Sequence, residues 1–323
     1  MAIKTGRLGW VGLAVEVTNG APVTPAHYIP YLECSMQEKI DVLADVSARG
    51  TRDEQPENSQ LGRQWGEGSL RVNLDATLAP VLFYGALGSL STASEGNGVY
   101  THTFSRLNTN APKSLSLTFN RAGQDQLIFP YSVINSLELS FDEGMAEISA
   151  NVMSRFPATN SSGTLSTTSG FYYAFRHATI QVGSSIVNAA NSASPLKVRS
   201  FNMSINNNSE LQFVAGNRNA DAIIYKNFGV SGSFRLAFED TTQRDNFYAL
   251  TKQAMIVTFA GNGIGNSMSE FVKLRFYKIR VADHPVTVPN DDYVSEEIQF
   301  IGEYSSGDSA SLDVQVRNRT SSY

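Results

Sequence analysis

The chain has 323 residues, 17% of them charged, and a formal net charge of −5. This length suits two domains of ordinary size, and the negative charge disfavours a protein that grips nucleic acid through its phosphates. The single cysteine, Cys34, excludes an intramolecular disulfide framework, and no apolar run approaches the about 20 residues of a membrane-spanning helix.

The N-terminal part of the chain lacks a regular period. Residues 1–27 are punctuated by glycine and contain Pro22 and Pro25, which predicts an extended arm. We expect a first strand within residues 28–36. Residues 37–65 are charged and unpatterned, which predicts a long loop. A loop of that length is generally functional or ordered by a neighbour, so it is the first candidate interaction element.

A strand followed by a helix comes next. Residues 67–75 place Leu70, Val72 and Leu74 on one face, which is the period of a half-buried strand. Pro80 is favoured in the first turn of a helix, and Gly88 is favoured just after its end. We therefore predict a helix over residues 80–87 that packs on the sheet.

More strands follow this helix. After a flexible loop at residues 89–98, alternation predicts strands at residues 99–104, 114–119 and 127–142. The segment Asp142-Glu-Gly-Met145 predicts a hairpin turn into a further strand that ends at Phe156. Residues 157–170 have the composition of a flexible linker, which predicts a domain boundary there.

The second half of the chain repeats the first. The spacing that relates Gly68 to Gly232 also relates Phe83 to Phe247, so the strand and the helix recur in one register. Residues 206–225 take the place of the 37–65 loop, and a slip of the apolar phase at Tyr277 predicts a β-bulge. We predict an arm at residues 1–27, domains at residues 28–156 and 171–323, and a linker at residues 157–170.

We find no residue pattern for catalysis or for metal binding. The four histidines are far apart, and none has a partner at a metal-ligand spacing. Adjacent carboxylates such as Asp291 and Asp292 point to opposite faces of a strand, which does not make an acid–base pair. The segment from Gly261 to Gly265 precedes a strand rather than a helix, unlike a phosphate-binding loop. We predict no enzyme activity, no cofactor and no metal.

Several short segments together resemble one family. They are residues 8–16, residues 19–25, the Gly-x-Gly-Ser-Leu strand at Gly66, its repeat at Val230, and residues 312–316. Their order and the duplication are similar to the tail tube (major tail) proteins of long-tailed bacteriophages, in the variety with two tandem tube domains. The resemblance covers almost the whole chain.

The resemblance implies a mainly β fold of two tandem β-sandwich or half-barrel domains, each with one flanking helix and long loops. It implies trimeric rings of pseudo-sixfold symmetry that stack into a tube, with other tail proteins at the tube ends. Double-stranded DNA would pass through the lumen during ejection without specific binding. The protein would be part of the virion, assembled in the bacterial cytoplasm, with no membrane partner.

Two groups of charged residues are candidates for contacts in such a tube. The candidate inter-ring residues are Asp41, Asp45, Arg49, Arg52, Asp53 and Glu54. The candidate residues of the seam between subunits are Glu138, Asp142, Lys273, Arg275, Lys278 and Arg280. The acidic strand of the first domain and the basic strand of the second would then lie side by side. Simple solvation of both faces, or a basic strand in the lumen, are alternatives.

Other functions also fit this sequence. Another tail component, such as a terminator or a tip protein, would share the composition. A surface carbohydrate-binding module or adhesin would show a cluster of exposed aromatic residues and would stay monomeric. An all-β hydrolase would need a catalytic constellation, and the sequence provides none.

Overall fold

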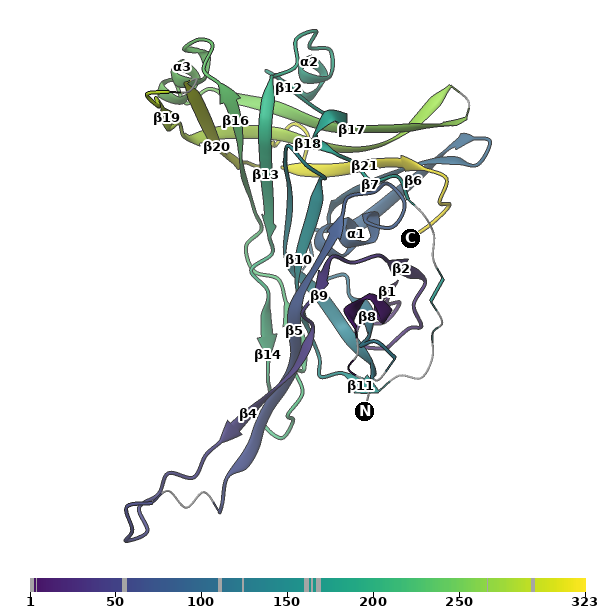
Figure 1. The fold of residues 1–323 in the computed structure, drawn as a ribbon, viewed down its shortest axis with the longest axis vertical. Helices are drawn as coiled ribbons and strands as arrows, with labels where there is room; N and C mark the ends of the chain where they lie inside the picture. The colour runs from purple at the N-terminus through teal and green to yellow at the C-terminus, as the bar shows by residue number, and fades with distance from the viewer. Residues whose placement is uncertain are drawn as a thin grey trace.

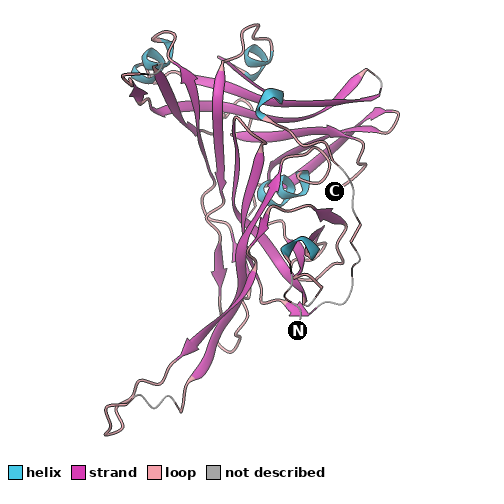
Figure 2. Cartoon of the chain, viewed as in Figure 1, coloured by secondary structure: helices cyan, strands magenta, loops and turns pink. Residues whose placement is uncertain are grey.

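The computed structural model describes the chain except residues 1, 2, 4, 54–56, 110, 111, 124, 160–162, 164, 167–169, 266, 292 and 293. Strands make up 55% of it and helices 9%, which confirms the prediction of a mainly β fold (Figure 2). Within the described residues, nineteen strands are hydrogen-bonded into one antiparallel sheet system (Figure 1). No helix in the described parts is long and apolar enough to cross a membrane.

The first half of the chain contains the helix α1 and the strands on either side of it. Its elements are β1 (Trp10–Val15), β2 (His27–Ile29), β3 (Glu33–Cys34), β4 (Gln37–Leu43), β5 (Gln60–Asn73), α1 (Pro80–Leu87), β6 (Gly88–Gly96), β7 (Val99–Arg106), β8 (Leu115–Asn120), β9 (Gln126–Asp142) and β10 (Glu147–Ser154). The predicted linker contains a short strand, β11 (Ala158–Thr159), which pairs with β9.

The second half follows the same plan with shorter loops. Its elements are β12 (Ala178–Gly183), α2 (Ile186–Ala190), β13 (Val198–Asn206), β14 (Glu210–Gln212), β15 (Ala222–Ile224), β16 (Gly229–Ala237), α3 (Thr242–Tyr248), β17 (Lys252–Gly265), β18 (Met268–Asp283), β19 (Val286–Thr287), β20 (Ser295–Gly302) and β21 (Leu312–Asn318). This half has two short α-helices where we predicted one flanking helix.

The strand pairing repeats as the sequence does. In the first half β4 and β3 pair with β5, which is followed by β10, β9, β8 and β1. In the second half β13 pairs with β16, followed by β20, β18, β17 and β12. The two series are joined because β9 also pairs with β13. We call residues 28–156 the first copy and residues 171–323 the second copy.

One row of paired residues shows how the joined sheet is built. Val72, Ile148, Leu139, Met203, Gly232 and Phe300 lie opposite one another on successive strands from β5 to β20. Alternate residues of a strand share a face, so this face supplies the core, which is continuous through both copies. The neighbouring row carries Asn73, Glu147, Ser140, Asn202, Ser233 and Gln299 and forms a polar face.

The predicted helix is confirmed at both ends. Pro80 occupies the first turn of α1, and Gly88 ends the helix with a φ of 86° while its N–H donates to the Tyr84 carbonyl. A left-handed residue at this position suits glycine because it has no Cβ. The predicted bulge is also confirmed, since Phe276 pairs with Met255 but Ile279 pairs with Gln253.

Two predicted loops contain strands. The two ends of the 37–65 segment pair as β4 and β5, in which Lys39 pairs with Trp65, and the resulting hairpin projects from the body of the molecule (Figure 1). Its alternation is hidden because both faces of β4 are largely exposed. Residues 89–98 form most of β6, a Ser-, Thr- and Ala-containing strand that is held by pairing with β7 rather than by burial.

The predicted N-terminal arm has its partner within the same chain. Strand β1 pairs with β8, and Val11 and Leu13 are buried. The arm is therefore extended, as expected, but it forms part of the first-copy sandwich in the free subunit.

Candidate assembly surfaces

The β4–β5 hairpin exposes an unusual number of apolar side chains. Ile40, Val42, Leu43, Val46 and Leu61 are all exposed large hydrophobic residues. Clustered exposed apolar side chains of this kind mark a surface that a partner covers. The hairpin is thus the most evident contact element of the subunit.

The candidate inter-ring residues lie along this hairpin. On β4, Asp41 accepts a hydrogen bond from Arg63 on β5 at 2.8 Å. Beyond it, Asp45 accepts from Ser47 and forms an ion pair with Arg49, and these hydrogen bonds hold the pKa of Asp45 below its usual value. The pairs lie at the surface and are partly exposed, so they contribute little to the stability of the subunit.

The remaining candidates lie at the hairpin tip. Arg52 is exposed there, and the Asp53 N–H donates to the Thr51 hydroxyl at 3.0 Å. Glu54 lies outside the described residues. The structure therefore brings the described inter-ring candidates onto one projecting arm.

A second hairpin lies beside the first. Strands β14 and β15 extend β13 and β16 in the way that β4 and β5 extend the first copy (Figure 1). The Gln64 N–H donates to the Arg218 carbonyl at 2.8 Å, and the Arg218 side chain donates to the Gly62 carbonyl at 3.0 Å. Each copy therefore contributes one projecting hairpin.

The acidic seam candidates lie inside the joined sheet. Glu138 and Asp142 are on β9, which has β10 on one side and β13 on the other. Their side chains are exposed on the polar face, where Glu138 accepts a hydrogen bond from Asn202 of the second copy. Any contact with another subunit would have to use this face, because the strand edges are occupied.

Two of the basic seam candidates already have carboxylate partners in the same chain. Arg275 donates to Asp313 at 2.7 Å, and the Tyr277 hydroxyl donates to the same carboxylate at 2.8 Å. Arg280 donates to Glu303 at 3.0 Å. The pair with Asp313 is the costlier one to break, because the Asp313 side chain is almost fully buried and would be left with an uncompensated charge.

The other two basic candidates are less engaged. The Lys273 ammonium lies 4.9 Å from the centre of the Phe271 ring, and burial together with the nearby Arg275 and Arg317 charges lowers the pKa of Lys273. Lys278 lies in the bulge of β18, between Phe276 and Ile279. The structure thus brings the basic residues together on β18, and only part of this charge is available to a partner.

The sequence analysis missed the contrast between the two equivalent helices. In α1 the aromatic residue Phe83 is fully buried, whereas on and after α3 Tyr248 is 73% exposed and Leu250 is 59% exposed. The Phe-Tyr pair recurs in both copies, but α3 carries Arg244, Asp245 and Asn246 where α1 carries Pro80, Val81 and Leu82. Phe247 still packs against the core, whereas Tyr248 lies in solvent.

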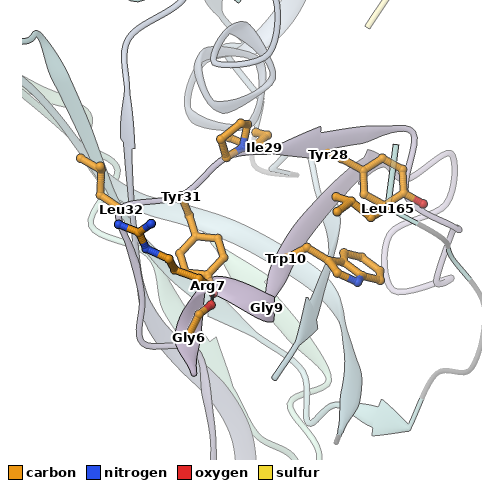
Figure 3. Close-up of a pocket in the computed structure, with 10 residues that line it drawn as sticks. Gly6, Arg7, Gly9, Trp10, Tyr28, Ile29, Tyr31, Leu32 and Leu165 are labelled. Atoms are coloured by element: carbon orange, nitrogen blue, oxygen red, sulfur yellow. Dashed lines mark hydrogen bonds between the residues drawn. The ribbon is translucent and has the colours of Figure 1, made fainter. Parts of the chain in front are cut away.

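A pocket of about 630 Å³ lies beside the N-terminal arm (Figure 3). The Trp10 and Tyr28 rings lie 5.2 Å apart, and the Tyr31 hydroxyl donates to the Gly6 carbonyl at 2.9 Å. Of the lining residues only Arg7 is charged. The described residues that line this pocket include no carboxylate, histidine or cysteine side chain.

The histidines also have structural partners. The His102 ring contacts the Thr92 hydroxyl and the Thr320 carbonyl, and His284 bonds Glu296 at 2.6 Å. In the described part of the chain no three His, Cys, Asp or Glu side chains gather into a possible metal site. The features described above are open strand edges, projecting hairpins and exposed apolar side chains, all of which are suited to contacts between subunits.

The family model of the phage tail tube protein matches residues 6–302. The chain belongs to this family. A comparison with curated protein sequences found no match. Membership makes the protein a structural component of the phage tail, and hence of the virion, that assembles with itself and with other tail proteins. The exposed hairpin and α3 surfaces agree with such a role.

Proposed function

We propose that this protein forms the rings of the tail tube, and that stacked rings enclose a lumen that conducts double-stranded DNA during ejection. The observation that carries this proposal is the pairing of β9 with β13, which joins the two copies into one continuous wall. A wall built from repeated units is suited to closure by rotation into a ring.

We further propose that the ring contains three subunits with pseudo-sixfold symmetry. Each chain supplies two equivalent units, so three chains supply six. The equivalent pairing series from β4 to β1 and from β13 to β12 supports this, because both copies can occupy similar positions in a ring. The two predicted domains, at residues 28–156 and 171–323, would be these units.

The polar face of the joined sheet is our candidate for the lumen wall. It presents serine and asparagine side chains, together with carboxylates such as Glu138 and Glu147, on neighbouring strands. Few cations would be available to bind phosphates, so DNA could pass without being held. No specific DNA site is needed for this function.

Stacking of rings would use the β4–β5 hairpin. The hairpin projects far from the body of the subunit (Figure 1), and its apolar side chains Ile40, Val42 and Leu43 are exposed. We propose that the tip, with Asp45, Arg49, Arg52 and Asp53, contacts the next ring. The subunits would be assembled in the bacterial cytoplasm.

Charge would help to set the order of subunits around the ring. As an alternative to the lumen wall, the polar face would lie between subunits, and we propose that its Glu138 and Asp142 would then attract the basic β18 of a neighbouring subunit. Lys273 and Lys278 are the better candidates for this attraction, because Arg275 and Arg280 are paired with Asp313 and Glu303. The contribution would be to specificity and rate more than to affinity.

Negative-stain microscopy of the purified protein tests the proposal. We expect rings or hollow tubes, and light scattering should show masses that are multiples of three subunits. A strictly monomeric protein at high concentration would contradict the tube. Rings that never stack at any concentration would instead support a terminator.

A further inference from the structure

We propose that neighbouring subunits join by antiparallel strand pairing between residues 281–287 of one subunit and residues 33–39 of the next. The register would be the one that β9 and β13 use within the chain. This inference rests on the proposed ring and adds to it the two strand edges and their alignment.

The first edge is the outer edge of β3 and β4. In the second copy Met203 pairs with Gly232, and in the first copy Met36 lies against Gly68, the equivalent glycine. Lys39 pairs with Trp65 in the same register as Asn206 pairs with Gly229. Residues 33–39 are therefore the counterpart of residues 200–206 in β13.

The second edge is the end of β18 with β19. In the first copy Ile148 on β10 pairs with Leu139 on β9. The counterpart of Ile148 in the second copy is Ile298 on β20. Asp283 pairs with Gln299 and Thr287 pairs with Ser295, so in the same register Ile298 lies opposite His284. Residues 283–287 are therefore the counterpart of residues 138–142 in β9, and a bulge before Asp283 brings Val281 to the position of Leu137.

Within the chain, these counterparts are paired with each other. Residues 136–142 of β9 pair with residues 200–206 of β13 over seven consecutive positions. By contrast, among the described residues β3 and β4 pair only with β5, and residues 281–287 pair only with β20, because β17 ends opposite Arg280. One subunit therefore carries both halves of a second, unformed β9–β13 pairing.

Side chains cap backbone groups at both edges. The His284 N–H donates to its neighbour Asp283 at 2.8 Å, and the Met36 carbonyl accepts from Arg121 at 3.3 Å. Natural proteins protect unpaired edges in such ways against uncontrolled association. Both caps come from partly or fully exposed side chains that an incoming strand can displace, and Arg121 also donates to Glu38.

The equivalent helices support the same arrangement. The first-copy helix α1 is covered by the second copy, where Asn207 donates to the Ala86 carbonyl at 3.0 Å and Tyr225 donates to the Gly85 carbonyl at 3.1 Å. In the repeat, Asn207 corresponds to Ile40. The hairpin that follows residues 33–39 is thus placed to cover the corresponding helix of another subunit.

That corresponding helix is uncovered. Tyr248 and Leu250, at α3, are exposed, and so are Ile40 and Leu61 on the hairpin that would reach them. Leu61 is the counterpart of Tyr225. Strand pairing in the proposed register would bring the two apolar groups together and remove both from water, which is favourable by about 25 cal/mol per Å² of apolar surface buried.

Cysteine cross-linking tests the register. In the proposed alignment Gln37 lies opposite Asp283, as Ser204 lies opposite Glu138 within the chain. We would combine Gln37→Cys with Asp283→Cys in a Cys34→Ser background and oxidise the assembled protein mildly. Directly opposed positions of this kind lie within reach of a disulfide, whereas diagonal neighbours are about 7–8 Å apart.

Two matched controls use the same background. Ser204→Cys with Glu138→Cys should form a disulfide within one chain and migrate as a monomer on a non-reducing gel. Ser35→Cys with Asp283→Cys is displaced by two residues along the strand and should link poorly. We expect the Gln37–Asp283 pair alone to convert most of the monomer band into dimers and trimers.

The outcomes separate this inference from the proposed function. If microscopy shows rings and the internal pair links, but the Gln37–Asp283 pair does not, the edge pairing is wrong while the ring stands. Equal linking by the displaced pair would also overturn the register. If no rings form at all, the proposed function fails, and this inference fails with it.

Discussion

Replacement of Gly68 by alanine should weaken the fold because the backbone of the next strand occupies the space that a Cβ needs. An alanine Cβ at this position would lie 2.6 Å from the Met36 Cα and from the Ser35 carbonyl oxygen. Ordinary van der Waals contacts begin near 3.4 Å. These neighbours are backbone atoms, so relief requires movement of β3 and β4 rather than rotation of a side chain.

The expected cost follows from that geometry. Overpacking a well-packed site typically costs about 1–3 kcal/mol, and we expect Gly68→Ala near the upper end because no flexible side chain can yield. A loss of about 3 kcal/mol corresponds to more than a hundredfold change in the unfolding equilibrium. Gly232→Ala, in the equivalent position, meets the Asn202 carbonyl and the Phe300 ring and should cost a similar amount.

Urea unfolding followed by circular dichroism, on subunits kept dilute, measures this difference. The matched control is Gly229→Ala, on the same strand as Gly232, where a Cβ meets nothing within 4 Å. The control should change the free energy of unfolding by no more than about 0.5 kcal/mol. If Gly68→Ala behaves like Gly229→Ala, our account of the repeated glycine is wrong.

Three further predictions concern assembly and reactivity. Deletion of residues 45–59 should leave folded subunits or single rings but abolish long tubes in electron micrographs, and unchanged tube length would reject the inter-ring role. Lys273→Glu with Lys278→Glu should block ring formation at low salt, and added Glu138→Lys should restore it; normal assembly of the double variant would count against the charged seam. Burial raises the pKa of Cys34 to about 11, so the thiol stays protonated and should resist iodoacetamide at pH 8 until the protein unfolds, as followed by mass spectrometry.

The choice of charge variants depends on the structure. Arg275 is unsuitable for charge reversal because it donates to Asp313, whose side chain is almost fully buried. Loss of one partner of such a pair costs about 3–5 kcal/mol, so an Arg275 variant would report on folding rather than on the seam. From the sequence alone, all four basic residues of β18 were equally good candidates for the seam between subunits.

The sequence determined those features that depend on neighbouring residues. The alternation of Leu70, Val72 and Leu74 placed β5, and Pro80 with Gly88 placed both ends of α1. The phase slip at Tyr277 located the bulge in β18. These signals are local, since a strand face, a helix end and a bulge are each fixed within a few residues.

The repeat was also visible in the sequence, but its consequences in space were not. Strands β4 and β6 escaped prediction because they are held by pairing and carry little apolar alternation. The candidate site was found in part: the hairpin was recognised as a contact element, whereas the uncovered α3 was missed. The two helices share only a Phe-Tyr pair, and the apolar α1 is buried whereas the more polar α3 is largely exposed.

Only the tertiary structure decided which strands meet. The pairing of β9 with β13 joins residues far apart in the chain, and no local pattern specifies it. It covers α1 and leaves residues 33–39 and 281–287 as open edges. Backbone hydrogen-bonding groups are nearly the same at every residue, so the sequence does not specify which strands pair with each other. Only the folded chain shows which strand edges are left unpaired and can therefore bind another subunit.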